Sequence, residues 1–190
     1  MQTSTGPNWL AATIAALTLA GCASGPAMPI TTEDYVDLDR FMGDWYVIAT
    51  IPTRFERDAH NAVETYARGD GNRIETTFTF LKGGFDGERK TYTPTGFVRE
   101  GTGNAEWGMQ FIWPFKAEYL VLYVDDDYRH TIIGRSKRDY VWIMARRPVI
   151  AEADFERMRA FIEAEGYDLD KLVTVPQRWP EPIMGPGGAH

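Results

Sequence analysis

The residue types that most often carry chemistry are few in this sequence. It contains one cysteine, Cys22, and three histidines, His60, His130 and His190. One cysteine excludes an internal disulfide, a cysteine-based metal site and a CxxC redox pair, and the histidines do not have metal-ligand spacing. A GxSxG segment is also missing, which excludes the serine nucleophile of an α/β-hydrolase. The sequence therefore predicts no catalytic residue, no metal and no cofactor, and it favours binding over catalysis.

Charge and length narrow the class of molecule. The 190 residues include 20 Lys+Arg and 27 Asp+Glu, which gives a formal net charge of −7. This acidic balance argues against a nucleic-acid partner, because a protein that follows phosphates needs a basic patch. The length favours one domain of roughly 150 residues with extensions. The 6 Trp, 9 Tyr and 10 Phe supply ample aromatic surface for a core or a binding site.

The segment before Cys22 indicates what that cysteine does. Residues 1–21 contain no Asp, Glu, Lys or Arg, and Trp9–Ala20 is an apolar run. Such a run has the length of a signal-peptide core and is too short for a bilayer, which needs about 20 residues. It ends in Leu19-Ala20-Gly21-Cys22, which resembles the bacterial lipobox. The resemblance implies cleavage before Cys22 and lipidation of this residue with diacylglyceryl and acyl groups.

After the N-terminal segment, short runs of β-branched and aromatic residues recur between turn residues. Eight such runs with short connections predict an all-β fold, an eight-stranded antiparallel up-and-down β-barrel. Pro94 lies inside one run and predicts a bulge or a distortion there. The runs are Trp45–Ile51, Ala62–Ala67, Arg73–Leu81, Lys90–Val98, Ala105–Ile112, Tyr119–Val124, Thr131–Arg135 and Tyr140–Arg146.

The pattern changes from strands to one helix after Pro148. Phe155, Met158 and Ile162 recur at helical spacing, and Gly166 stands where a C-terminal cap would be. We expect this flanking C-terminal helix to cover the outside of the barrel, and Lys171–Val175 to add a last strand beside the first.

Four segments are expected along the chain. They are a lipoprotein signal peptide over 1–21, a lipidated tether over 22–36, the barrel domain over 37–176, and an irregular Pro/Gly-rich tail over 177–190. Ala23 follows the cysteine at a position where Asp commonly retains lipoproteins at the inner membrane. The lipobox resemblance therefore implies a lipid anchor in the outer membrane.

The inward-facing residues decide whether the barrel is filled or holds a ligand, because an eight-stranded barrel has room for either. Trp107, Met109 and Phe111 alternate along one predicted strand, and Tyr119, Val121 and Tyr123 along the next. Together with Trp142 they are the predicted lining of a lumen. A filled core is the alternative for each of these side chains.

Three motifs resemble the lipocalin family. Gly43-Asp44-Trp45-Tyr46 is similar to the Gly-x-Trp signature of the first strand, and Asp125–His130, with Tyr128, to the second conserved turn. Asp139–Arg146 is similar to the third motif, whose arginine, here Arg146, packs across the Trp as a cation–π contact. The expected structural residues are Gly43, Trp45, Asp125, Tyr128 and Arg146, and His130 is expected to be structural as well.

The order of lipobox, tether and barrel, together with Arg54–Arg57, resembles the bacterial outer-membrane lipocalins. That resemblance implies a non-catalytic, often dimeric carrier of a fatty acid or lysophospholipid. Family topology implies that Trp113–Phe115 is an apolar tip at the mouth. The alternatives are a structural envelope protein with a filled barrel, a lipocalin-type enzyme, or haem binding through His60. The cations expected to meet a head group at the mouth are Arg54, Arg57, Lys82, Arg89 and Lys116.

Overall fold

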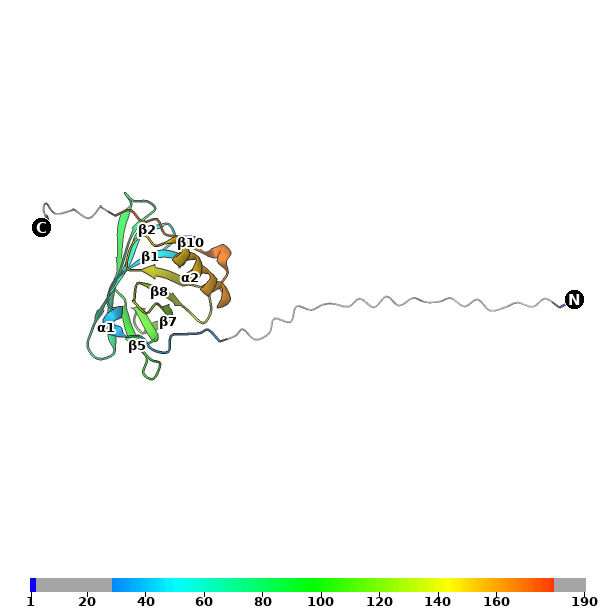
Figure 1. The fold of residues 1–190 in the computed structure, drawn as a ribbon, viewed down its shortest axis with the longest axis horizontal. Coiled ribbons are helices and arrows are strands. Elements are labelled where there is room, and N and C mark those ends of the chain that lie inside the picture. The colour runs from blue at the N-terminus through cyan, green and yellow to red at the C-terminus, as the bar shows by residue number, and fades with distance from the viewer. Residues whose placement is uncertain (3–28, 180–190) are drawn as a thin grey trace.

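In the computed structural model, which describes residues 1–2 and 29–179, one antiparallel sheet closes into a barrel (Figure 1). Successive positions in the barrel wall are filled in sequence order, and the last barrel strand pairs back with the first. The predicted eight-stranded barrel is confirmed, with β4 and β5 sharing one position in the wall. The strands are β1 (Gly43–Ile51), β2 (Ala59–Arg68), β3 (Arg73–Lys82), β4 (Glu88–Tyr92), β5 (Thr95–Val98), β6 (Glu106–Ile112), β7 (Phe115–Val124), β8 (His130–Gly134) and β9 (Val141–Ala145).

The interruption between β4 and β5 falls at Thr93 and Pro94. Both short strands pair with β3. Proline has no N–H for the ladder, and the Pro94 carbonyl accepts a hydrogen bond from the Thr76 N–H at 3.2 Å. The distortion predicted at Pro94 is therefore confirmed. β5 also pairs with β6, whereas β4 pairs with β3 alone among the described strand pairings, so the sheet is interrupted beside β4.

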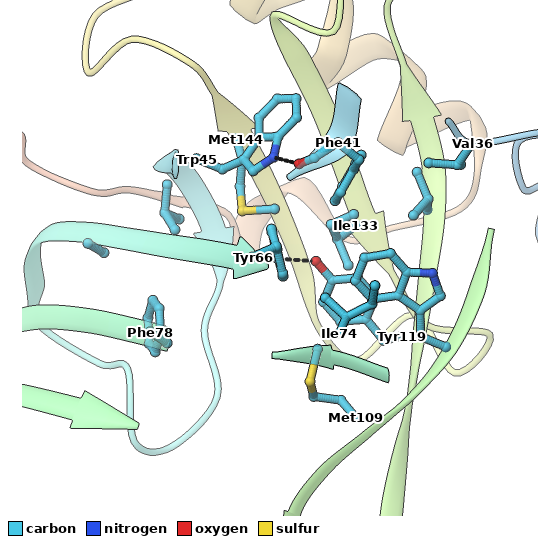
Figure 2. Packing of buried hydrophobic residues seen from close by; sticks show 14 of the residues in the cluster. Val36, Phe41, Trp45, Tyr66, Ile74, Phe78, Met109, Tyr119, Ile133 and Met144 are labelled. Carbon is cyan, nitrogen blue, oxygen red and sulfur yellow. Dashed lines mark hydrogen bonds between the residues drawn. The ribbon is translucent and has the colours of Figure 1, made fainter. Parts of the chain in front are cut away.

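One end of the barrel is closed by α1 (Leu38–Phe41) and a cluster of aromatic rings. Asp37 caps this short helix, since its carboxylate accepts hydrogen bonds from the Asp39 and Arg40 N–H groups. The Phe41 ring contacts the rings of Trp45 and Tyr66, and the Trp45 indole N–H donates to the Phe41 carbonyl at 2.8 Å (Figure 2). This end of the lumen is a packed core.

The outside of the barrel carries the predicted helix, α2 (Glu152–Ala164) (Figure 1). Met158 and Ile162 are fully buried in a second apolar cluster, where the outward-facing Leu120 and Leu122 of β7 also lie. Gly166 ends the helix with a φ of 87°, a conformation that glycine adopts without strain. The short 3₁₀ helix η1 (Leu169–Lys171) then leads to β10 (Val173–Thr174), which pairs with β1 as expected.

Both flanking segments lie on the barrel where the structure describes them. Glu33 binds β7 through its backbone N–H, which donates to the Val121 carbonyl. At the other end, the Gln177 side chain donates to the Val47 carbonyl at 2.8 Å, and the Trp179 ring lies 5.1 Å from Tyr46. Cys22 and the next six residues of the predicted tether, 23–28, lie outside the described residues. Within them, no helix has the length and hydropathy to cross a membrane.

Candidate functional site

A cavity of about 580 Å³ lies in the half of the barrel away from α1. Its walls are mostly apolar, and they come from β2, β3, β4, β6, β7 and β9 together with the 52–58 loop. Small-molecule sites are typically such concave apolar spaces with a few polar groups, with volumes of about 300–1,000 Å³. The lining includes Phe78, Tyr92, Met109, Ile112, Tyr119 and Trp142.

The lumen is therefore filled at one end and hollow at the other. Trp107 stacks on Tyr119 with ring centroids 5.2 Å apart, and its edge meets Phe41. Tyr119 lines the inner end of the cavity, whereas Trp107 lies behind it in the packed core; both belong to the buried cluster, in which Figure 2 labels Tyr119. The half of the barrel that contains α1 is filled, as the alternative expected, and the other half contains a cavity, as predicted.

The structure brings four of the seven predicted lumen residues to the cavity: Met109, Phe111, Tyr119 and Trp142. Phe111 lies at the rim, where it is 59% exposed. Trp107 and Val121 also face inward, but they are buried in the packed core and do not line the cavity.

The prediction that Tyr123 lines the lumen is wrong, because its side chain lies outside the barrel. It packs against Phe161 of α2, with ring centroids 5.6 Å apart. The pairing of β7 with β8 shifts between Val121 and Tyr123, which is a β-bulge at Leu122. A bulge places two successive residues on one face, so strict alternation assigns Tyr123 to the wrong side.

The five predicted head-group cations do not gather around the cavity. Arg54 lines it, whereas Arg57 lines a separate hollow beside β10. The Lys82 ammonium donates to the Arg57 carbonyl, and Arg89 is exposed on β4.

The prediction that Lys116 meets a head group at the mouth is also wrong, since Lys116 lies on the outer face of the barrel. Its ammonium is 3.5 Å from the centre of the Phe97 ring, and its stem crosses Gly108. His60, the haem-ligand alternative, packs on Phe85 with ring centroids 5.0 Å apart and borders the hollow beside β10, not the cavity.

Apart from Arg54, sequence reasoning missed the charged groups that line the cavity. Arg135 follows β8, pairs with Asp139 at 3.3 Å and lies 5.3 Å from the Tyr140 ring. Its Nε is buried and has no hydrogen-bond partner among the described residues. Glu118 is held by Ser136, whose N–H and hydroxyl both donate to it at 2.7 Å. The signal for Arg135 was its position as the last residue of the predicted strand Thr131–Arg135.

Two carboxyl groups complete the cavity wall, Glu56 half-buried and Glu64 buried. Glu56 accepts hydrogen bonds from the Thr53 N–H and the Trp142 indole, each at 3.2 Å, and burial raises its pKa. Glu64 lies deeper on β2, and burial raises its pKa to about 8, against the opposite effect of a hydrogen bond with Tyr66. Glu64 shares the parity of the inward-facing Ala62 and Tyr66, and that was the signal in the sequence.

The closed end contains the predicted structural motif. The Arg146 guanidinium lies 3.8 Å from the Trp45 ring and donates to the Asp44 carbonyl at 2.8 Å. Gly43 has a φ of 93°, and a Cβ there would lie 3.4 Å from Arg146 Nη1. Gly43, Trp45 and Arg146 therefore close the end of the barrel opposite the cavity mouth, and they do not border the cavity.

The second motif forms a tight turn between β7 and β8. Asp125 accepts hydrogen bonds from the Arg129 N–H at 2.5 Å and shares one with His130 Nδ1 at 2.8 Å. Tyr128 has a φ of 56°, and its hydroxyl accepts from the Asp37 N–H at 2.7 Å. The turn therefore fixes the segment before α1, which is a structural role for Asp125, Tyr128 and His130.

A closed eight-stranded barrel with an apolar cavity at one end and a packed core at the other defines a β-barrel binding protein. A family model described as a lipocalin-like domain matches residues 36–177. The chain belongs to the lipocalin family, most of whose members are binding proteins without enzymatic activity.

Individual relatives agree with this assignment. Outer membrane lipoprotein Blc of Citrobacter freundii is 31% identical over 172 residues, which cover 88% of this chain and 95% of that protein. Temperature-induced lipocalin-1 of Arabidopsis thaliana is 31% identical over 150 residues, covering 75% and 80%. Insecticyanin from the tobacco hornworm Manduca sexta has the same fold, with a TM-score of 0.62 at 17% identity, covering 80% of this chain and 86% of that one.

Proposed function

We propose that this lipocalin is a membrane-anchored carrier that holds one long-chain fatty acid or lysophospholipid, for storage or transport of lipids in the cell envelope. The observation that carries the proposal is the apolar cavity of about 580 Å³ at the open end. Each buried CH₂ group of a ligand contributes about 0.8 kcal/mol. A long acyl chain is therefore the ligand that gains most from this space.

Two guanidinium groups in the cavity wall would meet an acidic head group. Arg54 lines the mouth, and Arg135 has a buried Nε that lacks a partner in the described part of the chain. A guanidinium donates in a planar fork that fits a carboxylate or phosphate. We assign the head group to Arg54 and Arg135, because Lys116 faces outward and Arg57 lines another hollow.

The mouth itself is apolar and exposed. Phe111, Ile112, Trp113 and Phe115, at the β6–β7 hairpin, and Phe55, in the opposite loop, are 59–81% exposed. We call these five residues the apolar rim. Large exposed apolar patches mark sites of interaction, and Trp and Phe suit the interface of a membrane. Phe55, Phe111 and Ile112 also line the cavity, so the rim offers a lipid a continuous apolar path from a membrane.

The anchor would keep the rim close to a membrane. Six residues separate Cys22 from Pro29, where the described segment begins, a span of roughly 25 Å at most. The outer membrane is the proposed location because Blc of Citrobacter freundii, one of the relatives, is an outer membrane lipoprotein. Several acyl chains together give stable anchoring.

Mass spectrometry of the lipid that co-purifies tests the proposal. The full-length protein would be purified in a detergent, extracted with organic solvent and compared with an unrelated lipoprotein taken through the same steps. A single-chain lipid enriched only with this lipocalin is the expected result. Identical lipid profiles for both proteins would contradict the carrier function.

A further inference from the structure

Glu64 is a carboxyl group built into an otherwise apolar part of the cavity wall. Its cross-strand neighbours on β1 and β3 are Trp45 and Phe78. The residue is 9% exposed, and it lines the cavity together with Phe78 and Tyr119. The small exposed part of the Glu64 side chain therefore faces the cavity.

Glu64 has no basic partner in the part of the chain that the structure describes. It takes part in none of the ion pairs found among residues 29–179. A hydrogen bond joins it to the Tyr66 hydroxyl, which is hydrogen-bonded in turn to the Tyr119 hydroxyl. The other ionisable group that acts on it is Glu56, another acid. Burial without a counter-charge favours the neutral carboxylic acid.

A neutral carboxylic acid has an O–H donor and further acceptor positions on its two oxygens. The Tyr66 hydroxyl uses one of these positions. An all-hydrocarbon chain that filled the cavity would displace water from the others and leave them unpaired, which costs binding free energy. A chain that carries an oxygen at this depth would pair with them instead.

We infer that Glu64 is a subsite that hydrogen-bonds a neutral oxygen group, a hydroxyl or a carbonyl, on the inner part of a bound acyl chain. The inference rests on the proposed function, because a head group at Arg54 and Arg135 directs the far end of the chain toward Glu64. A ligand carboxylate at this depth would find no cation, and so the group is a neutral one. The preferred ligands are then oxygenated lipids.

The position of Glu64 along the cavity determines which carbon of a bound acyl chain lies next to it. Glu64 lies five residues along β2 from Ala59, which follows the loop at the mouth. At a rise of about 3.3 Å per residue, Glu64 is roughly 16 Å along the strand from its start. The preference should consequently appear at one range of chain lengths and fade for shorter chains.

The test is a titration of full-length, delipidated protein with fatty acids of increasing length and with their ω-hydroxy derivatives, read by tryptophan fluorescence. Wild-type protein should bind the ω-hydroxy acid roughly fivefold or more tightly than the plain acid at the matching length. Glu64→Gln, which keeps a donor and an acceptor, should retain the preference. Glu64→Leu should lose it and bind the plain acid more tightly. The control is Glu75→Gln, an exposed glutamate on β3, which should behave as wild type.

Two results would overturn the inference, and they are distinguishable. Equal affinity for plain and ω-hydroxy acids at every length, or a preference that survives in Glu64→Leu, would remove the subsite and leave the carrier function in place. Failure of every acid to bind would remove both.

Discussion

At the scale of single residues, Arg146 combines two kinds of contact at the closed end. Its guanidinium lies 3.8 Å from the Trp45 ring and donates hydrogen bonds to the backbone carbonyls of Arg40, Phe41 and Met42. The charge is partly desolvated there, and burial lowers the pKa of this arginine. The contacts join α1 to the start of β1.

We expect Trp45 and Arg146 to be energetically coupled. Trp45→Ala should lower the free energy of unfolding by about 3–5 kcal/mol through lost packing. Arg146→Ala should lower it by about 1–3 kcal/mol, since carbonyls lose their donors. A double-mutant cycle measured by urea denaturation should give a coupling of about 0.5–2 kcal/mol. A coupling near zero would mean that the two side chains act independently.

Glu64 makes stability depend on pH. Burial raises its pKa in the folded protein to about 8, from an ordinary value of 4.5. The folded state therefore holds a proton that the unfolded state releases, so this contribution to stability is complete below pH 4.5. It is lost as the pH rises from there to about 8, and the total loss is on the order of a few kcal/mol.

Glu64→Gln should remove this part of the pH dependence. Urea denaturation of the wild-type protein between pH 5 and pH 8 should show a falling free energy of unfolding, and the variant a flatter profile. Part of the slope should persist, because partial burial also raises the pKa of Glu56. Parallel profiles for the wild type and Glu64→Gln would show that Glu64 is ionised in the folded protein.

At the scale of elements, strand positions were predictable and the facing of side chains was less so. Alternation and turn residues located all eight barrel positions, and Pro94 marked the break between β4 and β5. Alternation failed at Tyr123, because the bulge at Leu122 reverses the parity of β7 and has no signature in the residue types. A single strand does not reveal such a shift, which depends on the pairing with β8.

The candidate site was only partly predictable, for a different reason. Met109, Phe111, Tyr119 and Trp142 were found from apolar alternation, a search that passes over charged residues. Glu64 and Arg135 were missed because residues of charged types are assigned to the surface when only the sequence is known. The family topology placed Lys116 at the mouth, whereas it lies on the outer face, where it contacts Phe97 of β5 across the intervening strand β6. That contact joins residues far apart in sequence.

The β6–β7 hairpin should mediate contact with membranes. We expect the double variant Trp113→Ser/Phe115→Ser, prepared without the lipid anchor, to co-sediment several-fold less with phospholipid vesicles while binding dissolved fatty acid as the wild type does. Val149→Ser is the matched control, since Val149 is an exposed apolar residue outside the rim. Unchanged sedimentation of the double variant, together with loss of a dimer in size-exclusion chromatography, would assign the rim to self-association instead.

At the scale of the whole molecule, one lipidated residue is expected to hold the protein at its membrane. Cys22→Ser should abolish incorporation of a radiolabelled or clickable fatty acid into the chain, and it should leave the protein soluble or unprocessed. Fractionation of cells with Ser24→Ala as the control checks this, because Ser24 lies two residues away and is not acylated in the lipobox chemistry. A processed Cys22→Ser protein that still sediments with membranes would place the anchor elsewhere.

The central claim is that the cavity at the open end binds a single-chain lipid, and titration of the delipidated protein tests it most directly. Burial of a palmitoyl chain yields on the order of 10 kcal/mol before the costs of association, which allows micromolar or tighter binding at about −8 kcal/mol. Tryptophan fluorescence should therefore saturate with palmitic acid or lysophospholipid in the micromolar range. Met109→Asp, in the cavity wall, should abolish the response, whereas Gln110→Asp, the next residue along β6, should preserve it. Absence of saturation below about 100 µM for both ligands, or equal binding by the two variants, would contradict the claim.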